Sequence, residues 1–168
     1  MAEITEKPRG TVVQLVNFRL RDEEFGVDIG SVREITKVAD VSPVPEAPSF
    51  IRGVTNLRGQ IIPVIDLAKQ FGLAPQEELP ESARIVVIEV KNQTVGILVD
   101  EVPEVMKLPE ENVHPTPELI QTGIKKDYVK GVGRLEKRLI ILLDLEKVLA
   151  PHQVAELTRK VGNKTTKE

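Results

Sequence analysis

The stretch IRGVTNLRGQIIPVID, residues 51–66, decides the fold of this chain. Two apolar runs flank the dipeptide Arg58-Gly59 at its centre. Glycine readily takes the positive φ angle that tight turns require, so the stretch is predicted to form a β-hairpin. Pro63 interrupts the second run. Because proline cannot donate to a sheet ladder, this strand is expected to lie at an edge or to contain a local break.

The same pattern occurs twice in the chain. A shift of 78 residues relates Phe50-Ile51-Arg52-Gly53-Val54 to Tyr128-Val129-Lys130-Gly131-Val132, Leu57 to Leu135, Ile62 to Ile140, and Asp66-Leu67 to Asp144-Leu145. A shift of 70 residues relates Leu15-Val16 to Ile85-Val86, Phe25-Gly26-Val27 to Val95-Gly96-Ile97, and Val32, Glu34 and Ile35 to Val102, Glu104 and Val105. The longer loop between Met106 and Asp127 can absorb the difference of eight residues between the shifts. The chain is therefore a duplicated module.

The duplication predicts two small subdomains within the 168 residues. A unit of about 60–70 residues builds only a marginal core, so the two copies are expected to pack on each other. The predicted divisions are a flexible N-terminal tail (1–10), a first β-barrel (11–72), a polar linker with prolines (73–82), a second β-barrel (83–150), and a C-terminal helix and tail (151–168).

Alternating Val, Ile and Leu residues predict a mainly β fold with about five strands in each copy, which indicates two five-stranded barrels. A short helix is predicted in IGSVREI, residues 29–35, and another in DLAKQFG, residues 66–72, ending at Gly72. In the second copy Pro103 weighs against the equivalent of the first helix. One helical turn is predicted at 118–121 and a tail helix from His152.

Composition excludes several classes of function. The chain has no cysteine, which excludes disulfides, thiolate metal sites and cysteine nucleophiles. The charged N-terminus lacks an apolar signal segment, and no apolar run approaches the ~20 residues of a spanning helix, so a cytoplasmic protein without membrane insertion is predicted. With 23 Lys and Arg against 26 Asp and Glu, and only five aromatic residues, the chain is a poor candidate for binding nucleic acid.

No catalytic or metal-binding constellation is apparent, and no cofactor is predicted. The two histidines, His114 and His152, have no neighbours at metal-ligand spacing. Asp66 and Asp144 occur in both copies where a strand gives way to a helix, so they are interpreted as N-caps rather than catalytic acids. Gly53 and Gly131 do not belong to a phosphate-binding loop and are interpreted as bulge or turn glycines.

Arg58 is a candidate contact residue. A hairpin turn requires glycine at one position but does not require arginine at the other, so Arg58 is expected to be exposed. The second copy has Glu136 and Lys137 where the first has Arg58 and Gly59. The tips have diverged while the apolar pattern beneath them has not. A partner contact and a solvated charge without a role both remain open on these grounds.

Four segments together resemble the CheW family of chemotaxis adaptors: FGVDIGSVREI, PEAPSFIRGVTNLRGQIIPVIDL, VGILVDEV and YVKGVGRLEKRLIILLDLEKVL. The resemblance extends over residues 12–157. It implies a pair of SH3-like β-barrels and a protein without enzymatic activity, located in the cytoplasm at membrane-associated chemoreceptor arrays. The implied partners are the regulatory domain of the histidine kinase CheA and the cytoplasmic tip of transmembrane chemoreceptors.

The resemblance also implies site residues. The receptor tip is expected to dock in the groove between the barrels, at Val32, Glu34, Gly53, Arg58, Ile85 and Val86. An apolar helix face would lie on the aliphatic residues, and the arginine and carboxylate would fix its register. Kinase binding is expected on the second barrel, at Gly96 and Gly131. The alternative function, a small barrel that binds nucleic acid, predicts affinity that falls with rising salt.

Overall fold

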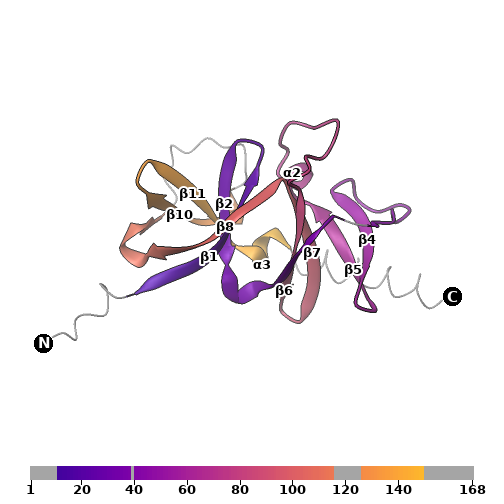
Figure 1. Cartoon of the computed structure of the whole chain (residues 1–168), viewed down its shortest axis with the longest axis horizontal. Helices are drawn as coiled ribbons and strands as arrows, with labels where there is room; N and C mark the ends of the chain where they lie inside the picture. The colour runs from indigo at the N-terminus through magenta and orange to yellow at the C-terminus, as the bar shows by residue number, and fades with distance from the viewer. Residues whose placement is uncertain (1–10, 39, 116–125, 150–168) are drawn as a thin grey trace, which may run out of the picture.

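The computed structural model describes residues 11–38, 40–115 and 126–149. The chain is mainly β, as predicted, and its strands form two sheets that lie side by side (Figure 1). Two short α-helices and three 3-10 turns complete the described elements. No helix within these ranges is long and apolar enough to cross a membrane.

Sheet A has the strand order β8-β1-β2-β11-β10-β9. Its strands are β1 (Val12–Leu20), β2 (Glu23–Asp28), β8 (Glu101–Pro109), β9 (Val113–His114), β10 (Val129–Leu135) and β11 (Arg138–Leu143). Sheet B has the order β3-β6-β7-β5-β4. Its strands are β3 (Val32–Lys37), β4 (Ile51–Leu57), β5 (Gln60–Asp66), β6 (Arg84–Val90) and β7 (Gln93–Val99).

Each sheet takes strands from both copies of the repeat. Sheet A joins β1 and β2 of the first copy to β8, β10 and β11 of the second, and sheet B contains the reciprocal set. Four pairings join the two copies: β1 with β8 and β3 with β6 are antiparallel, while β2 with β11 and β5 with β7 are parallel. The prediction that residues 11–72 and 83–150 form one barrel each is therefore wrong. A repeat shows which segments are equivalent, but it does not show which strands pair. An alternating apolar strand can bury its apolar face equally well beside a strand of its own copy or beside a strand of the other copy.

The two sheets are closed in the same way, which makes each of them barrel-like. In sheet B, Ser42 forms an isolated antiparallel bridge with Val54 of β4, and the Thr55 hydroxyl donates to the Asp40 carbonyl at 3.0 Å. In sheet A, β9 pairs with β10 at the equivalent place. Exchanging every strand for its equivalent converts the order of sheet B into that of sheet A, so the molecule has pseudo-two-fold symmetry.

Three apolar clusters form the interior. The smaller two belong to single sheets: one contains Leu15, Met106, Leu108, Ile140 and Leu142, and the other contains Ile62, Val64, Ile85, Val87 and Leu98. The largest lies between the sheets and takes residues from both, including Phe18, Phe25, Val86, Ile97 and Leu143. Burying one such side chain stabilises a fold by about 1.5–3 kcal/mol. Much of the stability of each sheet therefore depends on the other.

The helix predictions were partly right. Residues 29–35 do not form a helix, because the 3-10 turn η2 (Ile29–Ser31) leads directly into β3, where Val32 pairs with Ile88. The helices α2 (Leu67–Gln70) and α3 (Leu145–Val148) confirm the second prediction and its equivalent. The turns η3 (Glu110–Asn112) and η4 (Lys126–Tyr128) were not predicted. The turn at 118–121 and the tail helix lie outside the described residues.

The interpretation of the glycines and aspartates as structural residues is confirmed. The β4–β5 and β10–β11 registers shift between Ile51 and Gly53 and between Val129 and Gly131, as β-bulges do. The Asp66 carboxylate accepts from the Lys69 amide, and that of Asp144 accepts from the amides of the first turn of α3. Pro63 lies one residue before the β5–β7 ladder begins, so its missing N–H leaves that ladder intact.

Replacing Gly53 by alanine is expected to destabilise the fold by about 3 kcal/mol, because the backbone there is strained for a side chain and the pocket is full. Gly53 has φ +149°, and an added Cβ would lie 2.2 Å from the Ser42 carbonyl oxygen. Gly59 also has a positive φ, +85°, but nothing lies within 4 Å of its Cβ position. Gly59→Ala should therefore cost only about 1 kcal/mol. Urea unfolding measures the free energy of unfolding of both variants, and an equal loss of stability in the two would contradict the steric argument.

Candidate functional site

The six residues predicted to bind the receptor all lie in sheet B, although they come from both copies of the repeat. Val32 and Glu34 lie on β3, Gly53 on β4, Arg58 in the β4–β5 turn, and Ile85 and Val86 on β6. β3 and β6 are neighbours in the sheet, with Glu34 opposite Val87 and Ile35 opposite Val86. The exchange of strands between copies is what brings these residues together.

Arg58 stands at the tip of the β4–β5 hairpin and is 79% exposed. Arg58 and Gly59 both have positive φ, 54° and 85°, and the Gly59 amide donates to the Asn56 side chain, so the turn is well defined. The Arg58 guanidinium lies 3.3 Å from the Glu34 carboxylate on β3. An ion pair this exposed contributes little to stability. Arg58 is therefore available to a partner, as its position in the sequence predicted.

Two of the predicted apolar contacts are not on the surface. Ile85 and Val86 are 2% and 0% exposed, so their side chains contribute to the cores and cannot touch a partner directly. The exposed apolar residues nearby are Ile35 on β3 (39% exposed) and Ile61 on β5 (37% exposed), which the sequence analysis missed. The alternation of inward and outward residues along β3, with Val32 and Thr36 less exposed than Ile35, could have indicated Ile35.

The predicted kinase-binding glycines do not share a barrel. Gly96 lies on β7 in sheet B and Gly131 on β10 in sheet A. Both are buried, and an added Cβ would lie 2.8 Å from Ile85 Cγ2 and 3.0 Å from the His114 carbonyl oxygen, respectively. Their placement on one second barrel is therefore wrong. Both have a packing role, because a neighbouring strand approaches each of them too closely for a side chain.

Sheet A carries its own exposed apolar pair. Val105 on β8 and Leu139 on β11 are each 55% exposed. They are the equivalents of Ile35 and Ile61, related by the shifts of 70 and 78 residues. The apolar pair of sheet B thus recurs on sheet A, and in both sheets a glutamate, Glu34 or Glu104, precedes the first residue of the pair.

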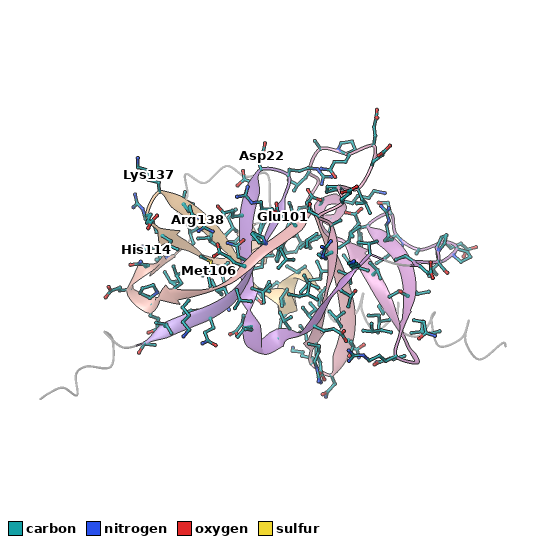
Figure 2. The ribbon with its side chains drawn as sticks, viewed as in Figure 1. Asp22, Glu101, Met106, His114, Lys137 and Arg138 are labelled. Atoms are coloured by element: carbon teal, nitrogen blue, oxygen red, sulfur yellow. The ribbon has the colours of Figure 1, made fainter. Side chains whose placement is uncertain are left out.

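Sheet A also carries a charged cluster, which includes Glu104 and Arg138, the residues that precede Val105 and Leu139 in the sequence. Arg138 Nη2 donates to Glu24 Oε1 at 2.7 Å and to Glu104 Oε2 at 2.8 Å. Asn17, which is fully buried, donates through Nδ2 to Glu24 Oε1 at 3.0 Å. The hydrogen bond from Arg138 holds the pKa of the Glu24 carboxyl below its usual value despite burial, and bonds to Glu24 and Glu104 raise the pKa of Arg138. Arg138 and Met106 appear together in sheet A in Figure 2.

The described residues contain no group of three or more His, Asp or Glu placed to hold a metal ion. Asp66 and Asp144 serve as helix caps, and His114 is an exposed residue of β9. His152 lies outside the described residues. A polar groove of about 460 Å³ runs between the sheets, next to α3 and η2.

Comparison with known proteins agrees with this geometry. The sequence profile of the CheW-like domain matches residues 14–152. This chain belongs to the CheW family. The chemotaxis protein CheW of Klebsiella aerogenes is 39% identical over 82% of this chain and 82% of its own, and that of Treponema pallidum is 38% identical over 86% of each. The crystal structure of the scaffolding protein TtCheW from Thermoanaerobacter tengcongensis matches with a TM-score of 0.76 at 36% identity, covering 83% of this chain and 88% of that one.

Membership of the CheW family makes this chain a chemotaxis adaptor. The match to TtCheW, with a TM-score of 0.76 over 83% of this chain, confirms the fold class predicted from the resemblance, a mainly β protein with two barrel-like modules. The CheW family is one of scaffolds and adaptors rather than enzymes, which accords with the surfaces described above.

The Glu24–Arg138 bond makes stability depend on pH. The pKa of Glu24 is lower in the folded state than in the unfolded chain, so its contribution is complete above the unfolded value and is lost as the pH falls through the folded value. Glu24→Gln should lower the free energy of unfolding by about 1–2 kcal/mol at pH 7, and this difference should shrink below about pH 4.5. Glu104→Gln, at a carboxylate that is 42% exposed, should cost less. Urea unfolding from pH 3 to 7 measures the difference in free energy of unfolding between the native chain and Glu24→Gln. A difference that stayed constant over this range would contradict the role given to the Glu24–Arg138 bond.

Proposed function

We propose that this protein couples the cytoplasmic tips of transmembrane chemoreceptors to the histidine kinase CheA, and that it does so without catalysis. The observation that supports the proposal is the pair of equivalent exposed surfaces, one on each sheet, that differ in charge. An adaptor requires two surfaces that do not compete. Binding to the receptors would hold the protein at membrane-associated arrays, although no helix among the described residues could span a membrane.

The receptor surface would be on sheet B, around the Glu34–Arg58 pair. Its apolar contacts would come from Ile35 and Ile61 and the partly exposed edge of Val32, while buried Ile85 and Val86 hold β3 and β6 in place. Gly53 would act through the backbone, since it lets the segment at Ser42 approach β4. A helical tip with one apolar face and a few polar groups matches this surface, because the two isoleucines offer area and the ion pair offers orientation.

The kinase surface would be on sheet A, where Val105 and Leu139 are exposed beside Glu104 and Arg138. The resemblance implies a pseudo-symmetric contact between barrels, and the equivalence of these residues to Ile35 and Ile61 fits such a contact. Gly131 would contribute indirectly by allowing β9 to pack on β10. Gly96 is in the other sheet and would contribute only to the packing of β7.

Arg58→Glu should weaken binding of a receptor cytoplasmic fragment at least about tenfold, because it reverses the charge of the most exposed polar group on the receptor surface. A change at an exposed turn leaves the core untouched, so unfolding should be unaffected. Titration calorimetry with the receptor fragment measures the affinity of Arg58→Glu, of the native chain and of Glu136→Arg, which changes the equivalent turn of sheet A. Glu136→Arg should bind receptor normally.

A charge-reversed pair separates direct contact from packing. Combining Glu34→Arg with Arg58→Glu restores an ion pair but presents the opposite charges to the receptor. Direct contact predicts that the double variant stays defective. Recovery of full affinity would show that only an ion pair between positions 34 and 58 is needed, and would remove Arg58 from direct contact with the receptor.

Leu139→Asp should weaken binding of the CheA regulatory domain at least about tenfold and leave receptor binding unchanged, since an exposed apolar anchor would be lost from one surface alone. Ile61→Asp, at the equivalent position of sheet B, should show the reverse. Each variant thus serves as the control of the other in the same two titrations. If both variants lost both partners, or neither lost any, the assignment of one partner to each sheet would be wrong.

A further inference from the structure

Because of the pseudo-two-fold symmetry, the surface where the two sheets meet has two equivalent positions, here called places, one beside α2 and one beside α3. Beside α3 lies the open groove of about 460 Å³. Its lining includes Lys91 and Glu146, whose equivalents beside α2 are Arg21 and Ala68. The two places are therefore built from corresponding residues, and what occupies them can be compared directly.

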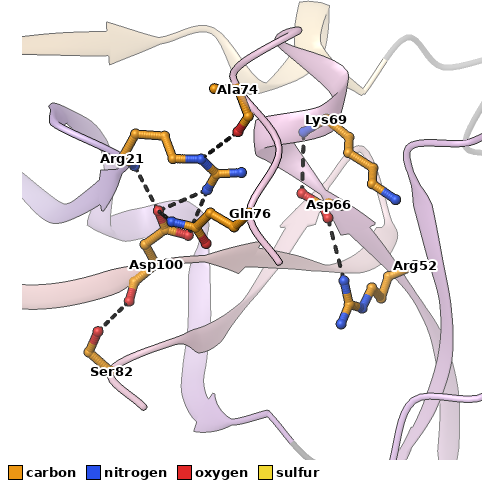
Figure 3. A network of polar contacts seen from close by, with 8 residues as sticks. All are labelled: Arg21, Arg52, Asp66, Lys69, Ala74, Gln76, Ser82 and Asp100. Atoms are coloured by element: carbon orange, nitrogen blue, oxygen red, sulfur yellow. Dashed lines mark hydrogen bonds and ion pairs between the residues drawn. The ribbon is translucent and has the colours of Figure 1, made fainter. Parts of the chain in front are cut away.

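Beside α2, the place is covered by the chain's own linker. Arg21 Nε donates to the Ala74 carbonyl at 2.7 Å, and the Leu73 amide donates to the Ala68 carbonyl at 2.9 Å. The Asp100 carboxylate holds Arg21 through contacts of 3.0 and 3.1 Å and also accepts from Gln76, while Ser82 donates to the Asp100 carbonyl (Figure 3). Leu73 packs on the central core. An extended, proline-bearing peptide is thus already seated at one of the two equivalent places.

The sequence after α3 lacks two features of the linker. The linker leaves α2 through Gly72, whose φ is +74°, and its first inward bond uses the Leu73 N–H. The residues 78 positions later are Ala150 and Pro151. Alanine avoids a positive φ, and proline has no N–H to donate. The features that return the chain onto its own surface beside α2 are therefore missing beside α3.

We propose that the groove beside α3 binds an extended segment of a partner protein, in the manner of the linker beside α2, with one aliphatic residue and at least one lysine or arginine. Val90 in the lining, which is only partly buried, supplies the apolar contact. Lys91, the equivalent of Arg21, is 59% exposed and can donate to a peptide carbonyl. The lining holds four carboxylates, those of Asp28, Glu89, Asp144 and Glu146. Glu89 pairs with Arg33 and Glu146 with Lys91, so Asp28 and Asp144 stand against Lys130 alone, which favours a basic segment.

The groove is separate from the surfaces assigned to the receptor and the kinase, and the proposal does not depend on that assignment. None of Glu34, Arg58, Val105 and Leu139 belongs to its lining. A segment bound there would leave both of those surfaces open. The linker also explains why such a site would occur once in the molecule rather than twice, since the chain itself covers the second place.

The test uses two fluorescent decapeptides: the linker sequence LAPQEELPES, and a version with lysine in place of its three glutamates. The full-length chain should bind the lysine version at least about tenfold more tightly than the native version in fluorescence anisotropy, and NMR shifts should cluster at Ser31, Lys91 and Asp144. Ser31→Arg adds bulk and positive charge to the groove and should abolish this binding. Glu101→Arg, at the equivalent exposed position beside α2, is the matched control and should bind normally.

Binding that survives Ser31→Arg, or that both variants lose equally, would overturn the proposal, and so would the absence of binding to the native chain. The other candidate for filling the groove is the chain's own segment, residues 150–168. Because the chain has no cysteine, Lys160→Cys allows a single spin label there. Broadening of the Lys91 and Asp144 signals by that label would show that this segment fills the groove, and would also overturn the proposal. Neither assay contains receptor or kinase, so the outcome is independent of the coupling function.

Discussion

The structure depends on the apolar core that the two sheets share. Phe18 and Phe25 of sheet A stack at 5.7 Å within a cluster that also contains Val86 and Ile97 of sheet B. Each sheet has only a small interior of its own, so separating the sheets would expose the largest cluster to water. The exchange of strands between the copies strengthens this dependence, because each half of the chain completes both sheets. The exposed surfaces of the two sheets are thereby held in a fixed relation.

Much of the fold could be predicted because the repeat preserves residues with a single structural use. Gly53 and Gly131 mark the two bulges, and Asp66 and Asp144 cap the two short helices, each at the position that the 78-residue shift predicts. The pairing between copies could not be predicted in this way. The segment 29–35 was misjudged because Val32 and Ile35 fit a helical spacing, whereas the pairing of β3 with β6 places them in a strand.

The candidate site was predicted less completely than the fold, for a reason that concerns burial. Ile85 and Val86 alternate in direction along β6, and one would expect a two-faced strand to expose one of them. Both are buried because β6 faces the interior of sheet B on one side and the shared core on the other. The exposed residues Ile35, Ile61, Val105 and Leu139 are as apolar as the buried ones. Apolar character alone cannot separate the two sets, and only the alternation along β3 carried a signal, at Ile35.

The two copies carry their arginine at different positions near the hairpin turn, and the two surfaces therefore differ in chemistry. In sheet B, Arg58 extends from the turn and remains 79% exposed beside Glu34. In sheet A the turn carries Glu136, and the arginine is two residues further along, where Glu24 and Glu104 hold Arg138 at 35% exposure. One surface presents an exposed cation paired with one carboxylate, and the other presents a less exposed cation between two carboxylates. A partner whose charges match one surface would leave a charge unsatisfied on the other, so the two related surfaces differ in the partners that they favour.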